Sequence, residues 1–173
     1  MQVIKCSLKD LQRVSDFYER VIDYLDAHEN FPIWEKGVYP CYDTIKIAIE
    51  KGDQYALEDN GQIIGALLFD QTPVGDYSVG EWQKDLKVGE YYIIHAFTTD
   101  YNCYKKGLGS FIMDWCKQKA RRDGKKAIRV DVVPTNYPAR NFYQKHGFIF
   151  AGEKDLKLGI KEIPIFALYE FLI

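Results

Sequence analysis

Apolar residues recur along this chain with two periods, and the periods alternate from one segment to the next. Near the N-terminus, apolar steps of three and four residues predict a helix over Leu8–His28. A second stripe of this kind predicts a helix that includes Phe111–Ala120. Shorter apolar runs between the helices predict strands. The resulting order, β-α-α-β-β-β-α-β-α-β-β, indicates an α/β domain with a mixed sheet.

Seven short segments have the apolar content and length of strands. They are Gln2–Cys6, Gln54–Glu58, Gln62–Asp70, Tyr91–Thr99, Ala127–Val132, Phe148–Gly152 and Ile163–Phe171. Asp59-Asn60-Gly61 separates the second from the third and is a hairpin signal, because Asn-Gly favours a tight turn. We therefore expect these two strands to pair with each other.

Turn-forming residues divide the rest of the chain. Phe31–Tyr42 holds two prolines and a glycine and is expected to be irregular, and Asp43 is the expected N-cap of the short helix that follows. Gln71–Glu90 reads as a polar excursion with a short helix near Glu81–Asp85. The last helix is expected to end at Gly147.

Composition limits the class of protein. The chain has 173 residues and a formal net charge of −2, which favours one globular domain over residues 1–173 and disfavours partnership with nucleic acid or membrane. Neither a signal peptide nor an apolar run long enough for a bilayer is expected. The four cysteines have no zinc-site spacing, so we expect no metal and a cytoplasmic location.

A turn after the Tyr91–Thr99 strand has the character of an anion site. It reads Lys105-Lys106-Gly107-Leu108-Gly109-Ser110 and opens the second long helix. Glycines at a helix start let backbone N–H groups approach a phosphate, and the helix dipole adds positive potential there. An ordinary strand-to-helix loop explains this turn alone equally well. It is neither a P-loop nor a dinucleotide fingerprint, because Ile112 stands where a third glycine is needed.

A second motif follows about 27 residues later. It runs from Asn136 to Phe148 and reads Asn-x-x-Ala-x-x-x-Tyr-x-x-x-Gly-Phe. By itself it suggests a helix cap at Asn136, a core aromatic at Tyr143 and a C-cap at Gly147. The two motifs together, with a strand between them, favour a cofactor that carries phosphate.

In this combination the chain resembles the GCN5-related N-acetyltransferases over Tyr91 to about Gly152. The family's turn usually reads Arg/Gln-x-x-Gly-x-Gly/Ala. Gly107 and Gly109 match it, whereas Tyr104 stands in the place of Arg or Gln. The resemblance implies this family's fold, with a sheet that splays open after the Tyr91–Thr99 strand. It also implies acetyl-CoA as the acyl donor.

The resemblance further implies roles for individual residues. Backbone groups of Phe97, Thr98 and Thr99 would pair with the pantetheine arm as an added strand would. Asn136 would bind the same arm, and Tyr143 would stand near the thioester sulfur as the general acid. The pyrophosphate turn would comprise Tyr104, Lys105, Lys106, Gly107, Leu108, Gly109 and Ser110.

Acyl transfer to an amine also needs a neutral nucleophile. A lysine-like amine with a pKa of about 10.4 is only ~1 part in 2,500 neutral at pH 7, so a general base or a desolvated site is expected. The candidate bases are His95, Glu81 and Glu90, and relay through water is the alternative. A tyrosine with a pKa of about 10 suits the acid role, which agrees with Tyr143.

The acceptor and the basic residues are less specific. Trp34, Tyr39 and Tyr42 lie in the segment that lines the acceptor side in the family, where aromatic rings suit a cationic amine; a loop pinned by buried rings explains them equally well. Arg140, or a lysine or arginine of the basic run 117–126, is a candidate for the 3′-phosphate of coenzyme A. A solvated helix face is the simpler interpretation of that run.

Three functions therefore remain open on the sequence. The first is N-acetylation of a primary amine on a small molecule or peptide by direct transfer. The second is a non-catalytic acyl-CoA-binding module, and the third is a nucleotide- or nucleic-acid-binding α/β domain. The apolar stretch Ile163–Ile173 also offers an edge for strand pairing in a homodimer.

Overall fold

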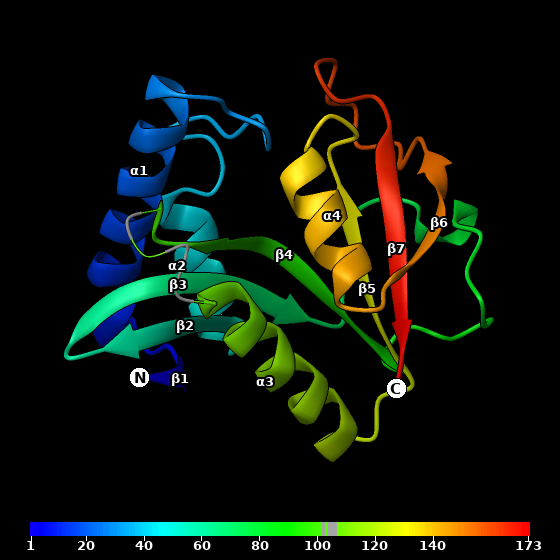
Figure 1. Cartoon of the computed structure of the whole chain (residues 1–173), viewed down its shortest axis with the longest axis horizontal. Helices are drawn as coiled ribbons and strands as arrows, with labels where there is room; N and C mark the ends of the chain where they lie inside the picture. Colours follow the sequence, from blue (N-terminus) through cyan, green and yellow to red (C-terminus); the bar gives the residue numbers. More distant parts are fainter. Residues whose placement is uncertain (102, 104–106) are drawn as a thin grey trace. The chain divides into compact units, whose positions relative to one another are not determined.

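The structure is a computed structural model that describes residues 1–101, 103 and 107–173. Contacts between residues divide the chain into two compact units. The first unit comprises Met1–Phe69 with His95–Cys116, and the second comprises Asp70–Ile94 with Lys117–Ile173. One strand and one helix, β4 and α3 in Figure 1, contribute residues to both units.

The observed elements follow the predicted order. The strands are β1 (Gln2–Lys5), β2 (Gln54–Asp59), β3 (Gln62–Asp70), β4 (Tyr91–Thr99), β5 (Ala127–Val132), β6 (Ile149–Lys154) and β7 (Phe166–Leu172). The helices are α1 (Leu11–Ala27), α2 (Tyr42–Lys51), α3 (Leu108–Arg122) and α4 (Tyr137–Lys145), and short 3-10 turns cover Leu8–Asp10 and Tyr77–Val79. The expected mixed α/β class is therefore confirmed.

In the first unit, β1, β2 and β3 form an antiparallel sheet. Val3 is opposite Leu57, and Ala56 is opposite Ala66. The predicted hairpin between β2 and β3 is present. Asn60 and Gly61 both have positive φ, at 48° and 77°, which is the conformation that a type I′ turn requires.

Helices cover both faces of the first unit's sheet. Apolar side chains of α1 and α2 pack with Ala56 and Ala66 on one face. Side chains alternate along a strand, so Tyr55 points to the other face, where its ring lies 4.8 Å from the ring of Trp115 in α3. Gly65 also lies under α3, because an added Cβ would come within 2.8 Å of Ile112. This close packing explains the glycine.

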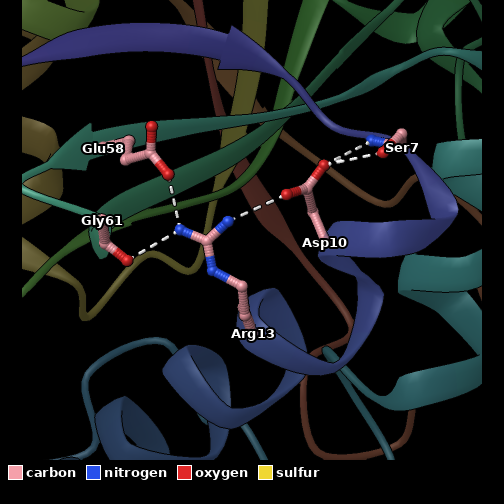
Figure 2. Close-up of polar contacts among 5 residues, drawn as sticks. All are labelled: Ser7, Asp10, Arg13, Glu58 and Gly61. Atoms are coloured by element: carbon pink, nitrogen blue, oxygen red, sulfur yellow. Dashed lines mark hydrogen bonds and ion pairs between the residues drawn. The ribbon is translucent and has the colours of Figure 1, made fainter.

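Arg13 joins the start of α1 to the β2–β3 hairpin (Figure 2). Its guanidinium donates to Glu58 at 2.5 Å, to the Gly61 carbonyl at 2.8 Å and to Asp10 at 3.0 Å. Asp10 in turn accepts from the backbone N–H of Ser7 at 3.0 Å. One arginine thereby fixes the first turn of α1 to the β2–β3 hairpin.

In the second unit the strand order is β4-β5-β7-β6. The β4–β5 pair is parallel, with Tyr91 opposite Ala127 and Ile94 opposite Val130, and the other two pairs are antiparallel. Because β7 is hydrogen-bonded to β5 on one side and to β6 on the other, it has no free edge along its paired length. The expectation that the last strand pairs across a dimer is therefore wrong for this strand.

The excursion between β3 and β4 covers one face of the second unit's sheet. Tyr77 and Leu156 belong to the apolar cluster on this face, and Trp82 packs against it. Arg129 of β5 packs against Trp82, with its guanidinium carbon 4.2 Å from the centroid of the Trp82 ring. Its Nε donates to the buried carboxylate of Glu170 at 2.9 Å. The excursion is thus held by a buried ion pair as well as by apolar contacts.

One predicted helix is wrong, and among the predicted boundaries that differ from the structure two have a clear cause. No helix forms at Glu81–Asp85, because the N–H of Glu81 donates to the Ala151 carbonyl and that of Gln83 to the Glu170 carboxylate. The N-cap of α2 is Cys41 and not Asp43, because the Thr44 hydroxyl accepts from the backbone N–H of Cys41 and the helix begins at Tyr42. The last strand begins three residues late, after Pro164, which has no N–H to donate to a ladder.

Candidate functional site

The C-terminal half of β4 has an irregular backbone in the first unit. Ala96 has a φ of 48°, which is left-handed and uncommon for a residue with a side chain. Phe97, Thr98 and Thr99 follow it and are half-buried. The strand is then fixed to β3 by the N–H of Asp100, which donates to the Ile64 carbonyl at 2.9 Å. The three residues predicted to contact the pantetheine arm therefore follow directly after a local distortion of the strand.

A buried tyrosine of α1 forms a hydrogen bond to this irregular part of β4. The hydroxyl of Tyr18 donates to the carbonyl oxygen of Ala96 at 2.8 Å, and the Tyr18 side chain is completely buried. Burial raises the pKa of Tyr18 well above its usual value, so the hydroxyl keeps its proton. The hydrogen bond thus joins the first helix to the one left-handed residue among the described residues of β4.

The turn that leads into α3 contains Gly107, whose φ is 69°. Its carbonyl accepts the first helical hydrogen bond, from the N–H of Phe111 at 3.1 Å. Leu108, Gly109 and Ser110 form the first turn of the helix, where N–H groups precede the helix's own acceptors. Three further residues of the predicted pyrophosphate turn, Tyr104, Lys105 and Lys106, lie outside the described residues.

The three candidate bases have different surroundings. His95 directly precedes Ala96, and its Nε2 atom is buried. Glu81 is 70% exposed and accepts from Lys154 at 2.6 Å. Glu90 forms an ion pair with Lys126, and the hydrogen bond from Lys126 lowers the pKa of the Glu90 carboxyl, followed by the bond from the Lys87 N–H. Both glutamates thus lie in ion pairs of the second unit.

Helix α4 presents the second predicted motif. The side-chain oxygen of Asn136 accepts from the N–H of Ala139 at 3.2 Å, which makes Asn136 the helix N-cap. The guanidinium of Arg140 donates to the Tyr169 hydroxyl at 2.9 Å and to the Pro134 carbonyl at 2.8 Å. Asn136 is therefore bound through its oxygen, so the amide Nδ2 is the group that would serve a cofactor.

Tyr143 lies on the inner face of α4 and is 4% exposed. Its ring meets the Phe148 ring edge-on, with centroids 5.2 Å apart, and lies parallel to the Tyr169 ring with centroids 6.5 Å apart. Both partners come from the same unit, one just before β6 and one within β7. The packing holds the direction of the ring, which a group that delivers a proton requires.

The predicted acceptor residues lie in the irregular segment between α1 and α2. Trp34 is half-buried, and its ring meets those of Tyr18 and Tyr39 edge-on, at 6.0 and 6.5 Å between centroids. Tyr39 is 37% exposed and Tyr42 is 46% exposed. The structure thus brings Trp34 and Tyr39 together and leaves Tyr42 largely in solvent, at the first position of α2.

Sequence reasoning did not single out Tyr18 or Ala96. Tyr18 belongs to the apolar stripe of the first helix, where it looks like any core residue. Ala96 stands inside a continuous apolar run, and a left-handed conformation has no signal there because glycine and asparagine are the usual markers. Only the three-dimensional contact identifies the pair.

The residues present fit a phosphate-bearing acyl donor. Among the described residues, no atom lies within 4 Å of a Cβ placed on Gly107, and Gly107 immediately precedes α3, where a helix N-terminus favours an anion. No group of three or more metal-ligating side chains occurs in the described ranges. Nor does any helix within those ranges combine the length and apolarity that a membrane span requires.

Comparison with known proteins gives a consistent result. The model of the acetyltransferase (GNAT) family matches residues 16–148. No curated protein sequence matches the chain. Solved structures do, among them a GNAT-family acetyltransferase from Listeria monocytogenes, which is 19% identical with a TM-score of 0.77 over 99% of this chain and 94% of the other.

Two further structures show the same fold. A GNAT-family acetyltransferase from Streptococcus agalactiae is 14% identical, with a TM-score of 0.76 over 99% of this chain and 95% of the other. A ribosomal-protein-alanine N-acetyltransferase from Brucella melitensis is 12% identical, with a TM-score of 0.71 over the full length of both chains. Because the family model spans more than half of the sequence, the chain belongs to the GNAT family of acetyltransferases.

Proposed function

We propose that this GNAT-family protein transfers the acetyl group of acetyl-CoA to a primary amine of a small molecule or peptide. The observation that carries the proposal is the helix start at Gly107, which has positive φ, follows β4 and matches the glycine position of the family's turn. Backbone groups at these two places would serve opposite ends of one elongated donor.

On the donor side, the N–H groups of the first turn of α3 would bind the pyrophosphate. The positive end of the helix dipole supports this role, as does the lack of any described atom within 4 Å of a Cβ built on Gly107. Phe97, Thr98 and Thr99 would offer backbone groups to the pantetheine arm, and the Nδ2 group of Asn136 would donate to the same arm.

The reaction needs no covalent enzyme intermediate. The amine nitrogen forms a bond to the thioester carbonyl carbon, the carbon–sulfur bond then breaks, and the amine loses one proton while the sulfur gains one. A backbone N–H of β4 would stabilise the negative charge on the carbonyl oxygen. Tyr143, which is held by ring packing, would give the proton to the sulfur.

His95 is the base that we favour among the three candidates. Its Nε2 is buried beside the distorted part of β4, whereas Glu81 is exposed and Glu90 has a lowered pKa and is therefore a weaker base. Relay of the proton through a water molecule satisfies the same requirement.

The acceptor would lie against the aromatic segment around Trp34 and Tyr39. Aromatic rings attract a cationic amine before it loses its proton, and Glu35 adds negative charge nearby. The Brucella structure carries ribosomal-protein-alanine in its name, which makes a peptide with an N-terminal alanine one reasonable acceptor to test beside small polyamines.

The test is a panel of amines and peptides with acetyl-CoA. Release of free thiol together with an acetylated product, identified by mass spectrometry, is the expected result. Acetyl-CoA binding should be measured separately by calorimetry. A protein that binds acetyl-CoA but acetylates no amine would be the non-catalytic module, and one that does not bind acetyl-CoA would contradict the proposal altogether.

A further inference from the structure

We propose that Tyr18 is a positioning residue for the acyl donor. Through its hydrogen bond to the Ala96 carbonyl it would hold the peptide between Ala96 and Phe97 in the orientation that aims the Phe97 N–H at the donor. The inference rests on the proposed function, because that function assigns the Phe97 backbone to acetyl-CoA.

The first step of the argument is the conformation of Ala96. A residue with a Cβ pays a steric penalty at a φ of 48°, and a strand offers no local reason to accept it. Such conformations persist only where surrounding contacts determine them, and they gather at functional sites. Something in the structure must therefore hold Ala96.

The second step is the contact that does so. The Tyr18 hydroxyl donates to the Ala96 carbonyl at 2.8 Å, and both groups are buried, with Tyr18 at 0% and Ala96 at 9% exposure. A carbonyl so buried cannot exchange this bond for one to bulk water. Breaking it leaves an unsatisfied acceptor in a dry environment, which penalises this arrangement of the backbone.

The third step follows from the planar trans peptide. In such a peptide the carbonyl oxygen and the N–H point in opposite directions. The Ala96 carbonyl points to Tyr18 on α1, so the N–H of Phe97 points away from that helix. Tyr18 thereby fixes the direction of a backbone donor that lies on the far side of the strand from itself.

The position of Tyr18 is itself well determined. Its ring meets the ring of Phe17 with centroids 5.7 Å apart and that of Trp34 with centroids 6.0 Å apart, both edge-on. Burial also raises the pKa of its hydroxyl, which stays a donor throughout the working pH range. The carbonyl of Ala96 thus faces a donor that is fixed in both place and protonation state.

The experiment compares Tyr18→Phe with two partner variants. Tyr18→Phe keeps the ring and removes the hydroxyl. Ala96→Gly removes the steric penalty of positive φ, because glycine adopts that conformation freely. The double variant Tyr18→Phe/Ala96→Gly joins both changes. Tyr92→Phe is the matched control. The Tyr92 hydroxyl also donates a hydrogen bond within the fold, to Asp123 at 2.6 Å, and Tyr92 lies on β4 as Ala96 does.

Acetyl-CoA affinity by calorimetry and the melting temperature of the unliganded protein are the two readouts. We expect Tyr18→Phe to weaken acetyl-CoA binding about tenfold, since that is the effect of one lost hydrogen bond. The double variant should return to within about threefold of wild type even where its melting temperature stays low. Tyr92→Phe should change the melting temperature and leave the affinity unchanged.

Other outcomes overturn the inference. Unchanged affinity in Tyr18→Phe, or a loss that Ala96→Gly does not restore, would mean that Tyr18 only stabilises the core. If Tyr18→Phe does not fold, Ala96→Val replaces it, because a branched side chain disfavours positive φ and should weaken binding in the presence of Tyr18; unchanged affinity there is equally contrary. Absence of acetyl-CoA binding in the wild type would instead refute the proposed function.

Discussion

At the scale of single residues, the first turn of α3 is the proposed pyrophosphate site. We expect Gly109→Glu to abolish acetyl-CoA binding, because the added carboxylate crowds and repels a pyrophosphate at the helix start. Calorimetric titration measures this directly. Gln118→Glu is the matched control, because it adds the same charge to an exposed position of the same helix and should leave the affinity intact. Retained binding in Gly109→Glu would move the phosphate site elsewhere.

Tyr143 offers a different test at this scale, because its ring and its hydroxyl have separable roles. Tyr143→Phe keeps the contacts with Phe148 and Tyr169, so the protein should fold. We expect kcat to fall about 10²-fold or more with little change in acetyl-CoA affinity, as loss of a general acid does.

The control for this change is Tyr137→Phe on the same helix, where the side chain is 61% exposed. It should leave both kcat and affinity unchanged. Steady-state kinetics with the best acceptor from the amine panel gives both constants, and undiminished turnover in Tyr143→Phe would remove Tyr143 from the acid role.

Among the elements, α4 has a cap that the sequence also assigns to the cofactor. Asn136→Ala removes the oxygen that accepts from Ala139 and should lower the free energy of unfolding by about 1 kcal/mol. Asn136→Asp keeps that oxygen and replaces the amide NH₂ group with a second carboxylate oxygen, which adds a negative charge that an N-cap also accepts. It should therefore unfold like wild type in denaturant yet bind acetyl-CoA more weakly. Equal affinity in Asn136→Asp and wild type would restrict this residue to capping.

Elements with a strong period were predictable, whereas only some of their ends were. The bounds of β3, β4 and β5 agree with the sequence prediction, because Asp70 ends the first run, Asp100 follows the second, and Pro134 lies two residues after the third. The excursion over residues 71–90 was predictable only as irregular chain. The path of its backbone depends on hydrogen bonds to Arg129 of β5 and Glu170 of β7. Both residues are distant in sequence, so no local pattern predicts these contacts.

In the candidate site, too, some features have a local sequence signal and others depend on distant contacts. Gly107 and Asn136 could be placed at helix starts from the sequence, because helix starts and caps leave a local signature, and the site roles of Gly107, Asn136 and Tyr143 stay predictions that rest on the family resemblance. Tyr18 and Ala96 have no such signature, because the hydrogen bond between them joins residues 78 positions apart. Distant pairs of this kind become visible only when the chain is folded.

For the molecule as a whole, acid sensitivity should depend in part on Asp10. Partial burial raises the pKa of its carboxyl, but hydrogen bonds from Ser7 and the charge of Arg13 outweigh burial and the net pKa is lowered. A carboxyl whose pKa is lower in the folded than in the unfolded chain stabilises the fold at pH values above the unfolded pKa, which is about 3.9. This contribution is lost as the pH falls through the folded pKa.

Denaturant titrations of wild type and Asp10→Asn at a series of pH values test this. Wild type should be the more stable at pH 7, and the difference should shrink as the pH falls below about 4. A difference that stays constant with pH would mean that Asp10 contributes through packing or neutral hydrogen bonds and not through its charge.

The ring contacts around Tyr18 also bear on how freely this chain can be re-engineered. Tyr39 touches Trp34, Trp34 touches Tyr18, and Tyr18 bonds to Ala96 of β4. The segment between α1 and α2 consequently cannot be replaced without regard to these contacts. A replacement of this segment must keep an aromatic ring at position 34, or it removes a ring contact of Tyr18, which bonds to β4. Sequence diversification is safer at outward positions such as Val38, which is 58% exposed.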